Sequence, residues 1–202
     1  LYCYMKTWRE LDETRLDETE FKTDMGYDNF IFVGSGTDLF ARNIPKEWIE
    51  RTLNHCHNAN NNLFGATNKY FFQSKNPKRI LDFIEHPVFE HSVVCTTIET
   101  NRFNREYMGY APKIEDRVTA MEAINKQGFE TYVTIEPIMD FDLEELAEQI
   151  KRCNPKQVNI GKNSKEEIIK LPHPPLDKVK QLIIELRKFT NVEIKDNLKK
   201  KK

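Results

Sequence analysis

The sequence predicts an α/β protein, a partial TIM-like (β/α) barrel built on a parallel sheet. Short apolar runs of strand type alternate five times with helical patterns along the chain. These runs are apolar on both faces, which is typical of parallel strands covered by helices. Six such runs in 202 residues are too few for a closed barrel, which usually takes about 250 residues. A doubly wound open sheet is the alternative architecture.

The predicted helices and strands follow from the spacing of apolar residues and from the positions of proline and glycine. The strands are expected at 30–33, 70–72, 92–98, 130–135, 157–160 and 192–194. The helices, whose apolar residues recur at steps of three and four, are expected at 46–59, 77–85, 114–127, 143–153 and 176–189. Pro45, Pro77 and Pro175 stand at or just before helix starts, where a missing N–H is harmless. Gly128 follows the third helix, where a left-handed residue would end it.

Composition and charge set the class of protein. We expect one domain over residues 1–195 and a basic, disordered tail at 196–202. The formal net charge of −1 gives no general positive field for a polyanionic partner, so nucleic acid is neither required nor excluded. No apolar run approaches the roughly 18 residues that span a bilayer, and no signal peptide precedes the first charged stretch. A cytoplasmic protein without a membrane partner is therefore expected.

The four cysteines are widely separated and fall into two kinds. Cys56, Cys95 and Cys153 lie in apolar segments and are expected to be reduced, buried thiols. Cys3 lies in an aromatic-rich start, LYCYMK, that begins with Leu rather than Met. We therefore expect the sequence to be a fragment or a processed product.

Polar residues and glycines follow each of the first five predicted strands. In parallel α/β folds the loops after the strands build the active site, because side chains from several strands converge there. The candidate ligand-binding residues at these exits are Gly34, Ser35, Gly36, Thr37, Asp38, Ser74, Lys75, Thr97, Glu99, Asn101 and Glu136. Each can be a turn, a solvated charge or an ion pair when taken alone. Their coincidence at successive exits is the stronger signal.

These residue types suit a small zwitterionic nucleoside. A glycine-rich exit lets a ligand approach backbone N–H groups, Asp38 can accept from an ammonium group, and Lys75 can neutralise a carboxylate. Glu99, Asn101 and Glu136 can accept hydrogen bonds from ribose hydroxyls or adenine edges. We expect Glu136 and Lys75 to point into the same mouth of the barrel as Asp38, because all three follow apolar strand runs.

Three segments carry a resemblance to a known superfamily. The start LYCY resembles the end of the C-x3-C-x2-C motif of radical S-adenosylmethionine (SAM) enzymes. Residues 31–40 (IFVGSGTDLF), with SKNP at 74–77 and IEP at 135–137, resemble an uncharacterised group of phage and bacterial radical-SAM-like proteins. They are similar, more distantly, to spore photoproduct lyase. The resemblance runs from Cys3 to about Lys162, and it implies that two further motif cysteines and the first barrel strand precede Leu1.

The resemblance also implies cofactors. Cys3 would be one of three thiolates holding a 4Fe-4S cluster, whose fourth iron is left for SAM. An electron donor such as a flavodoxin or ferredoxin would supply the cluster, which would reduce SAM and release a 5'-deoxyadenosyl radical. That radical abstracts hydrogen from a substrate, and the family likeness suggests a nucleic acid or a nucleotide.

Roles at the strand exits are implied in the same way. Gly34, Ser35 and Gly36 stand where the superfamily contacts the methionine part of SAM, but Thr37 and Asp38 replace the glutamate that is usual there. The Ser74 and Lys75 pair would meet the SAM carboxylate. The residues that would fall near ribose and adenine are Thr97, Glu99 and Glu136.

Two other classes of function compete with this one. A barrel without a cluster can bind nucleic acid through basic residues Lys75, Lys78 and Arg79, with an aromatic run at 70–72 as a stacking platform. Aromatic residues in a strand are more often core, which weakens this alternative. A metal-dependent hydrolase needs clustered His ligands at strand exits, whereas the five histidines mostly fall in predicted helices or loops.

Overall fold

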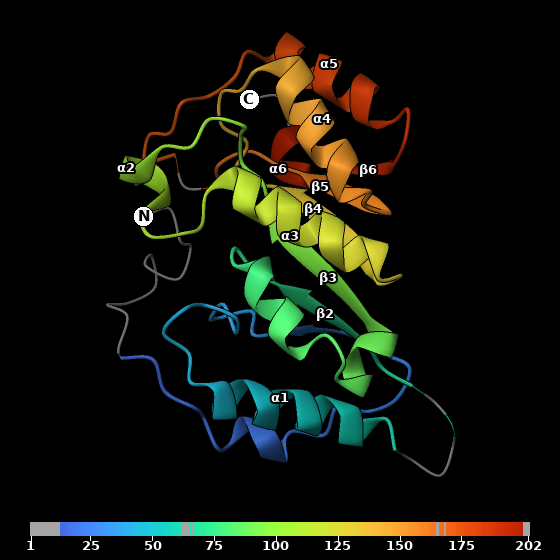
Figure 1. The fold of residues 1–202 in the computed structure, drawn as a ribbon. Coiled ribbons are helices and arrows are strands. Elements are labelled where there is room, and N and C mark those ends of the chain that lie inside the picture. Colours follow the sequence, from blue (N-terminus) through green and yellow to red (C-terminus); the bar gives the residue numbers. More distant parts are fainter. Residues whose placement is uncertain (1–12, 62–64, 66, 165, 168, 200–202) are drawn as a thin grey trace.

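The computed structural model describes residues 13–61, 65, 67–164, 166–167 and 169–199. Six parallel strands form one open sheet in which strand order follows sequence order (Figure 1). The strands are β1 (Phe30–Val33), β2 (Lys69–Gln73), β3 (Ser92–Thr97), β4 (Glu130–Ile135), β5 (Gln157–Ile160) and β6 (Asn191–Ile194). The predicted α/β class and parallel sheet are confirmed, and the unclosed sheet is consistent with a partial barrel.

The connections between strands are mostly helical. The longer helices are α1 (Lys46–Ala59), α3 (Ile114–Lys126), α4 (Leu143–Cys153) and α5 (Leu176–Leu186). The shorter ones are η2 (Glu20–Lys22), η3 (Pro77–Phe83), η4 (Pro87–His91), α2 (Arg105–Met108) and α6 (Asp196–Lys199). Because consecutive strands are neighbours, right-handed crossovers place the connecting helices on the same face of the sheet. This order excludes the doubly wound alternative.

Two predicted segments differ from the structure. The α-helix expected at 77–85 is instead the 3-10 helix η3 over Pro77–Phe83, and a second 3-10 helix, η4, follows it from Pro87. The tail expected to be disordered begins with the short helix α6. Residues 200–202, which follow α6, lie outside the described part. Gly128, at φ +91°, ends the α3 segment as expected. No helix within the described ranges is long and apolar enough to cross a membrane.

The main core lies between the sheet and the long helices. Strand residues such as Tyr70, Phe72 and Val94 pack there with side chains of α1, α3, α4 and α5. The second face of the sheet carries a separate small cluster of Phe71, Val93 and Cys95. The expectation that the strands are apolar on both faces is therefore only partly met, because this second face becomes polar toward the carboxyl ends of the strands.

Strand β1 lies at the edge of the sheet and pairs with β2 alone among the described strands. Its residues Phe30 and Phe32, on the second face, keep 58% and 47% of their surface exposed. Both rings pack edge-on or tilted against Phe71, with centroids 5.7 and 5.2 Å away. The strand expected to precede β1 falls outside the described residues.

Candidate functional site

Three of the predicted residues meet at the carboxyl ends of β1, β2 and β3. Asp38 Oδ2 accepts the backbone N–H of Lys75 at 2.9 Å, and the other oxygen accepts the N–H of Phe40 at 3.1 Å. The ammonium group of Lys75 lies 2.9 Å from Glu99 Oε1, and a third of the Lys75 side chain stays exposed. Three separate exits are thus joined by side-chain contacts, as expected for convergent parallel strands.

Glu99 continues this chain of contacts into the protein interior. Its second oxygen accepts from Arg117 Nη1 at 2.9 Å, and both side chains are 0% exposed. Arg117 also donates to the carbonyls of Thr97 (2.8 Å) and Pro112 (2.9 Å). The role expected for Glu99 is corrected: it is sealed from ligand and holds Lys75 instead. Because isolated buried charges are costly, each member of this network depends on the others.

Arg117 was missed by the sequence reasoning, although the pattern contains a signal for it. The buried face of α3 includes Ile114, Val118, Met121 and Ile124. Arg117 lies three positions after the first of these, so it shares the face that turns inward. A cation on an apolar helix face, in a helix that follows a strand exit with a carboxylate, indicates a buried ion pair.

The glycine-rich exit of β1 forms a tight turn beside a cavity. Gly34 has φ +71°, and the N–H of Thr37 donates to its carbonyl at 3.1 Å. A Cβ on Gly34 would lie 2.8 Å from Thr37 O, so the position requires glycine. The adjoining cavity of about 710 Å³ is lined by residues 34–37, by side chains of α1 and by the segment 14–25. Ligand binding at this turn stays a prediction.

Hydroxyl and amide groups occupy the second face near the carboxyl ends of β2 to β5. Gln73 Nε2 donates to Thr97 Oγ1 at 3.0 Å. The Thr134 hydroxyl lies 3.4 Å from Cys95 Sγ, and Asn159 accepts from Gln157 at 2.9 Å. Such groups can hydrogen-bond a ligand in either direction, because each carries donors and acceptors.

Glu136 lies at the same edge but belongs to a different cluster. Its carboxylate pairs with Lys195 and accepts from Asn197 Nδ2 at 2.9 Å. A Cβ on Gly161 would lie 2.8 Å from Glu136 Oε1, so the glycine makes room for this carboxylate. Neither Lys195 nor Asn197 was a candidate from sequence. The described contacts join Glu136 to the exits of β5 and β6 rather than to Asp38 and Lys75.

Two further candidates are occupied by local structure. Asn101 donates to Asp142 and Glu145, at 3.0 and 2.9 Å, and accepts the backbone N–H of Asp142. Ser74 is 1% exposed, and its hydroxyl accepts the N–H of Asn76 at 2.9 Å. Both stabilise loops beside the mouth instead of facing open space.

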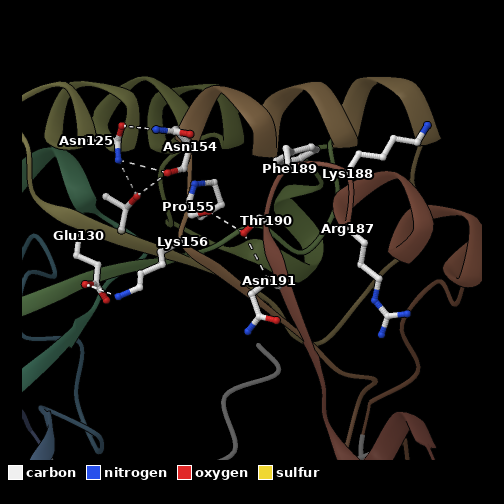
Figure 2. Close-up of a pocket in the computed structure, with 11 residues that line it drawn as sticks. Asn125, Glu130, Asn154, Pro155, Lys156, Arg187, Lys188, Phe189, Thr190 and Asn191 are labelled. Carbon is white, nitrogen blue, oxygen red and sulfur yellow. Dashed lines mark hydrogen bonds and ion pairs between the residues drawn. The ribbon is translucent and has the colours of Figure 1, made fainter.

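A second hollow, of about 670 Å³, opens at the amino ends of β4 to β6 (Figure 2). Its wall is cross-linked by the side chains of Asn125 and Asn154, 2.9 Å apart, and by the bond from Thr190 Oγ1 to Pro155 O at 2.7 Å. Glu130 pairs there with Lys156 at 3.0 Å. This hollow therefore lies at the opposite end of the strands from the predicted site residues.

The thiols of the described residues do not fit an iron–sulfur cluster. Cys56, Cys95 and Cys153 lie buried in α1, β3 and α4, and burial raises the pKa of each thiol to about 12. Within the described ranges no group of three His, Cys, Asp or Glu side chains can hold a metal ion. Cys3 lies outside the described residues.

Some of the groups that the sequence offered for nucleic-acid binding are occupied by the protein itself. Tyr70 and Phe72 belong to the main core, at 0% and 1% exposure. The guanidinium of Arg79 donates to the carbonyls of Ala41 and Ile44. The aromatic run in β2 is therefore not a stacking platform.

Comparisons with known proteins found no relative of this chain. No known protein family matches the chain, and no curated protein or solved structure matches it significantly.

Proposed function

We propose that this chain forms the SAM-binding body of a radical SAM enzyme, with SAM held at the carboxyl ends of β1 to β4. The observation that carries the proposal is the contact chain from Asp38 through Lys75 to Glu99, which draws three strand exits together. It places an ammonium group at the strand exits close to the glycine turn, an arrangement suited to an amino-acid carboxylate. The nearby hydroxyl and amide groups suit a ribose.

The structure changes the roles expected of individual residues. Lys75 is the proposed partner of the SAM carboxylate, and Glu99 with Arg117 sets the position of its ammonium group. The backbone N–H groups of residues 34–36 are the proposed contacts for the methionine part of SAM. Gln73 is half-buried and donates to the buried Thr97, so Gln73 is the member of this pair that is proposed to contact the ribose. A 4Fe-4S cluster and a flavodoxin or ferredoxin donor belong to the proposal through Cys3 and the family resemblance alone.

SAM binding provides the direct test. Lys75→Met keeps the length of the side chain and removes its charge, so we expect the dissociation constant for SAM, measured by calorimetry, to rise at least about tenfold. The matched control is Lys180→Met on α5, whose ammonium pairs with Asp177 on an exposed surface. Its affinity should equal that of the unmodified chain. Absence of SAM binding by the chain, or equal affinities for all three proteins, would overturn the proposal.

Iron binding should separate Cys3 from the other three cysteines. We expect anaerobic reconstitution of the 202-residue chain to give no stable four-iron cluster, because three of its four thiols are buried, protonated and carried by separate elements. Iron and sulfide counts check this result, and mass spectrometry after brief alkylation should find Cys56, Cys95 and Cys153 unmodified until the chain is unfolded. Four irons per chain, together with SAM cleavage, would contradict this assignment of the thiols.

A further inference from the structure

The connection from β3 to α3 is long and lies at the mouth of the candidate site. It spans residues 98–113 and contains the single-turn helix α2 (Figure 1). Most connections in compact domains are about four to six residues long, and longer ones are commonly functional. Because it follows the carboxyl end of β3, this loop belongs to the edge where α/β proteins bind ligands.

Both ends of the loop are fastened to the body of the protein. At its start, Arg102 donates to Asp140 at 2.6 Å and to Asp142 at 2.7 Å. The hydrogen bond from Arg102 lowers the pKa of Asp142 well below its usual range, so this contact persists at neutral pH. At its end, the Pro112 carbonyl accepts from the buried Arg117. The loop is therefore held in place by the same network that positions Lys75.

The tip between these anchors carries aromatic side chains in water. Tyr110 is 97% exposed and Phe103 is 37% exposed. The guanidinium carbon of Arg105 lies 5.7 Å from the centroid of the Tyr110 ring, which is cation–π range. Gly109, at φ +60°, turns the chain so that Tyr110 projects outward. Binding residues are frequent on loops that a rigid scaffold holds in place, so the exposed ring with its neighbouring guanidinium is a candidate ligand contact.

The excess of positive charge on the loop favours a ligand that carries negative charge. Residues 101–113 contain three cationic side chains, Arg102, Arg105 and Lys113, and one anionic side chain, Glu106. The ion pairs of this loop are formed by Glu99 and Arg102, and none among the described residues involves Arg105 or Lys113. A ligand that places a flat ring on Tyr110 and a negative charge near Arg105 satisfies both features.

We propose that the 98–113 loop binds a nucleobase by stacking it on Tyr110, with Arg105 contacting the adjoining phosphate. A nucleobase has a π face, and its phosphate supplies the charge that a peptide aromatic side chain lacks. The shared chemistry can come from a free nucleotide or from a single-stranded nucleic acid. The idea that the bound base is the substrate rests on the proposed function. The binding of the base to this loop does not depend on it.

Fluorescence anisotropy of the full chain with fluorescein-labelled dT12 tests the stacking. Stacking one base on an aromatic ring corresponds to about a five- to 150-fold change in affinity, so Tyr110→Ala should weaken binding by that factor. Tyr110→Phe keeps the ring and should bind within about twofold of the unmodified chain. Tyr27→Ala is the control: it removes another tyrosine, 54% exposed and just before the amino end of β1, and should leave the affinity for dT12 unchanged.

Competition and salt dependence identify the source of the base. If dTMP, at the same concentration of bases, displaces labelled dT12, the loop is a site for free nucleotides. If only unlabelled dT12 displaces it, the loop is a site for single-stranded nucleic acid. Both results support the proposal. Failure of dT12, rU12 and dTMP to bind overturns it, as does equal binding by Tyr110→Ala and the unmodified chain. Tyr110→Ala should leave the affinity for SAM unchanged. If the unmodified chain binds dT12 but does not bind SAM, the proposed enzyme function is rejected and the base-binding proposal stands.

Discussion

Replacing Arg117 by Met is expected to lower the free energy of unfolding by about 3–5 kcal/mol, because it leaves the carboxylate of Glu99 buried with one cation instead of two. The Thr97 and Pro112 carbonyls would lose their donor at the same time. Urea unfolding followed by circular dichroism at pH 7 measures the loss. Adding Glu99→Gln to this variant removes the second charge and should restore part of the stability.

An exposed arginine provides the matched control for this prediction. Arg152 on α4 also pairs with two carboxylates, those of Glu115 and Glu122, but a third of its side chain is exposed. Arg152→Met should therefore cost no more than about 1 kcal/mol. Equal losses for the two arginine variants would contradict the account of Glu99 and Arg117 as a sealed pair.

Raising the pH from 8 to 10 is expected to destabilise the protein by roughly 3–4 kcal/mol through its buried thiols. Each of Cys56, Cys95 and Cys153 has a pKa raised from 9.0 to about 12 by burial. Between these values the unfolded chain loses thiol protons that the folded chain keeps, so stability is full below pH 9 and is lost as the pH rises toward 12. Burial also raises the pKa of Tyr70 and Tyr132, which acts in the same direction.

One cysteine variant isolates the thiol contribution from other alkaline titrations. Cys153→Ala should remove about 1 kcal/mol of the stability difference between pH 8 and pH 10, since one thiol no longer titrates. The measurement is urea unfolding at both pH values for the variant and the unmodified chain. An unchanged pH dependence would show that Cys153 is not buried as a neutral thiol.

The fold class and several contacts were predictable because they follow from local pattern. Alternating strand and helix patterns gave the parallel sheet, and the strand expected at 130–135 has the bounds of β4. Of the three residues expected to share one mouth, Asp38 and Lys75 are in contact, whereas Glu136 pairs with other residues. Periodicity alone cannot distinguish a 3-10 helix from an α-helix over so short a span, which explains the error between β2 and β3.

The remaining site residues depend on long-range packing that local pattern does not encode. Glu99 looks like an exposed acceptor in sequence, and only the burial of Arg117 beneath the 98–113 loop shows that it is sealed. Lys195 and Asn197 lie about 60 residues from Glu136, next to a run of lysines whose composition suggests a solvated tail. Their partnership with Glu136 requires β6 to lie beside β5.

The sequential order of the strands has an implication for synthesis on the ribosome. Each strand pairs with the one made just before it, so a newly emerged strand always finds its template already outside the exit tunnel. Growth of the sheet then proceeds in one direction, and every intermediate exposes a single strand edge at its advancing side. The helix α6 follows β6, and Asn197 within it donates to Glu136 and to the Lys162 carbonyl. These bonds can form only after β6 has paired with β5.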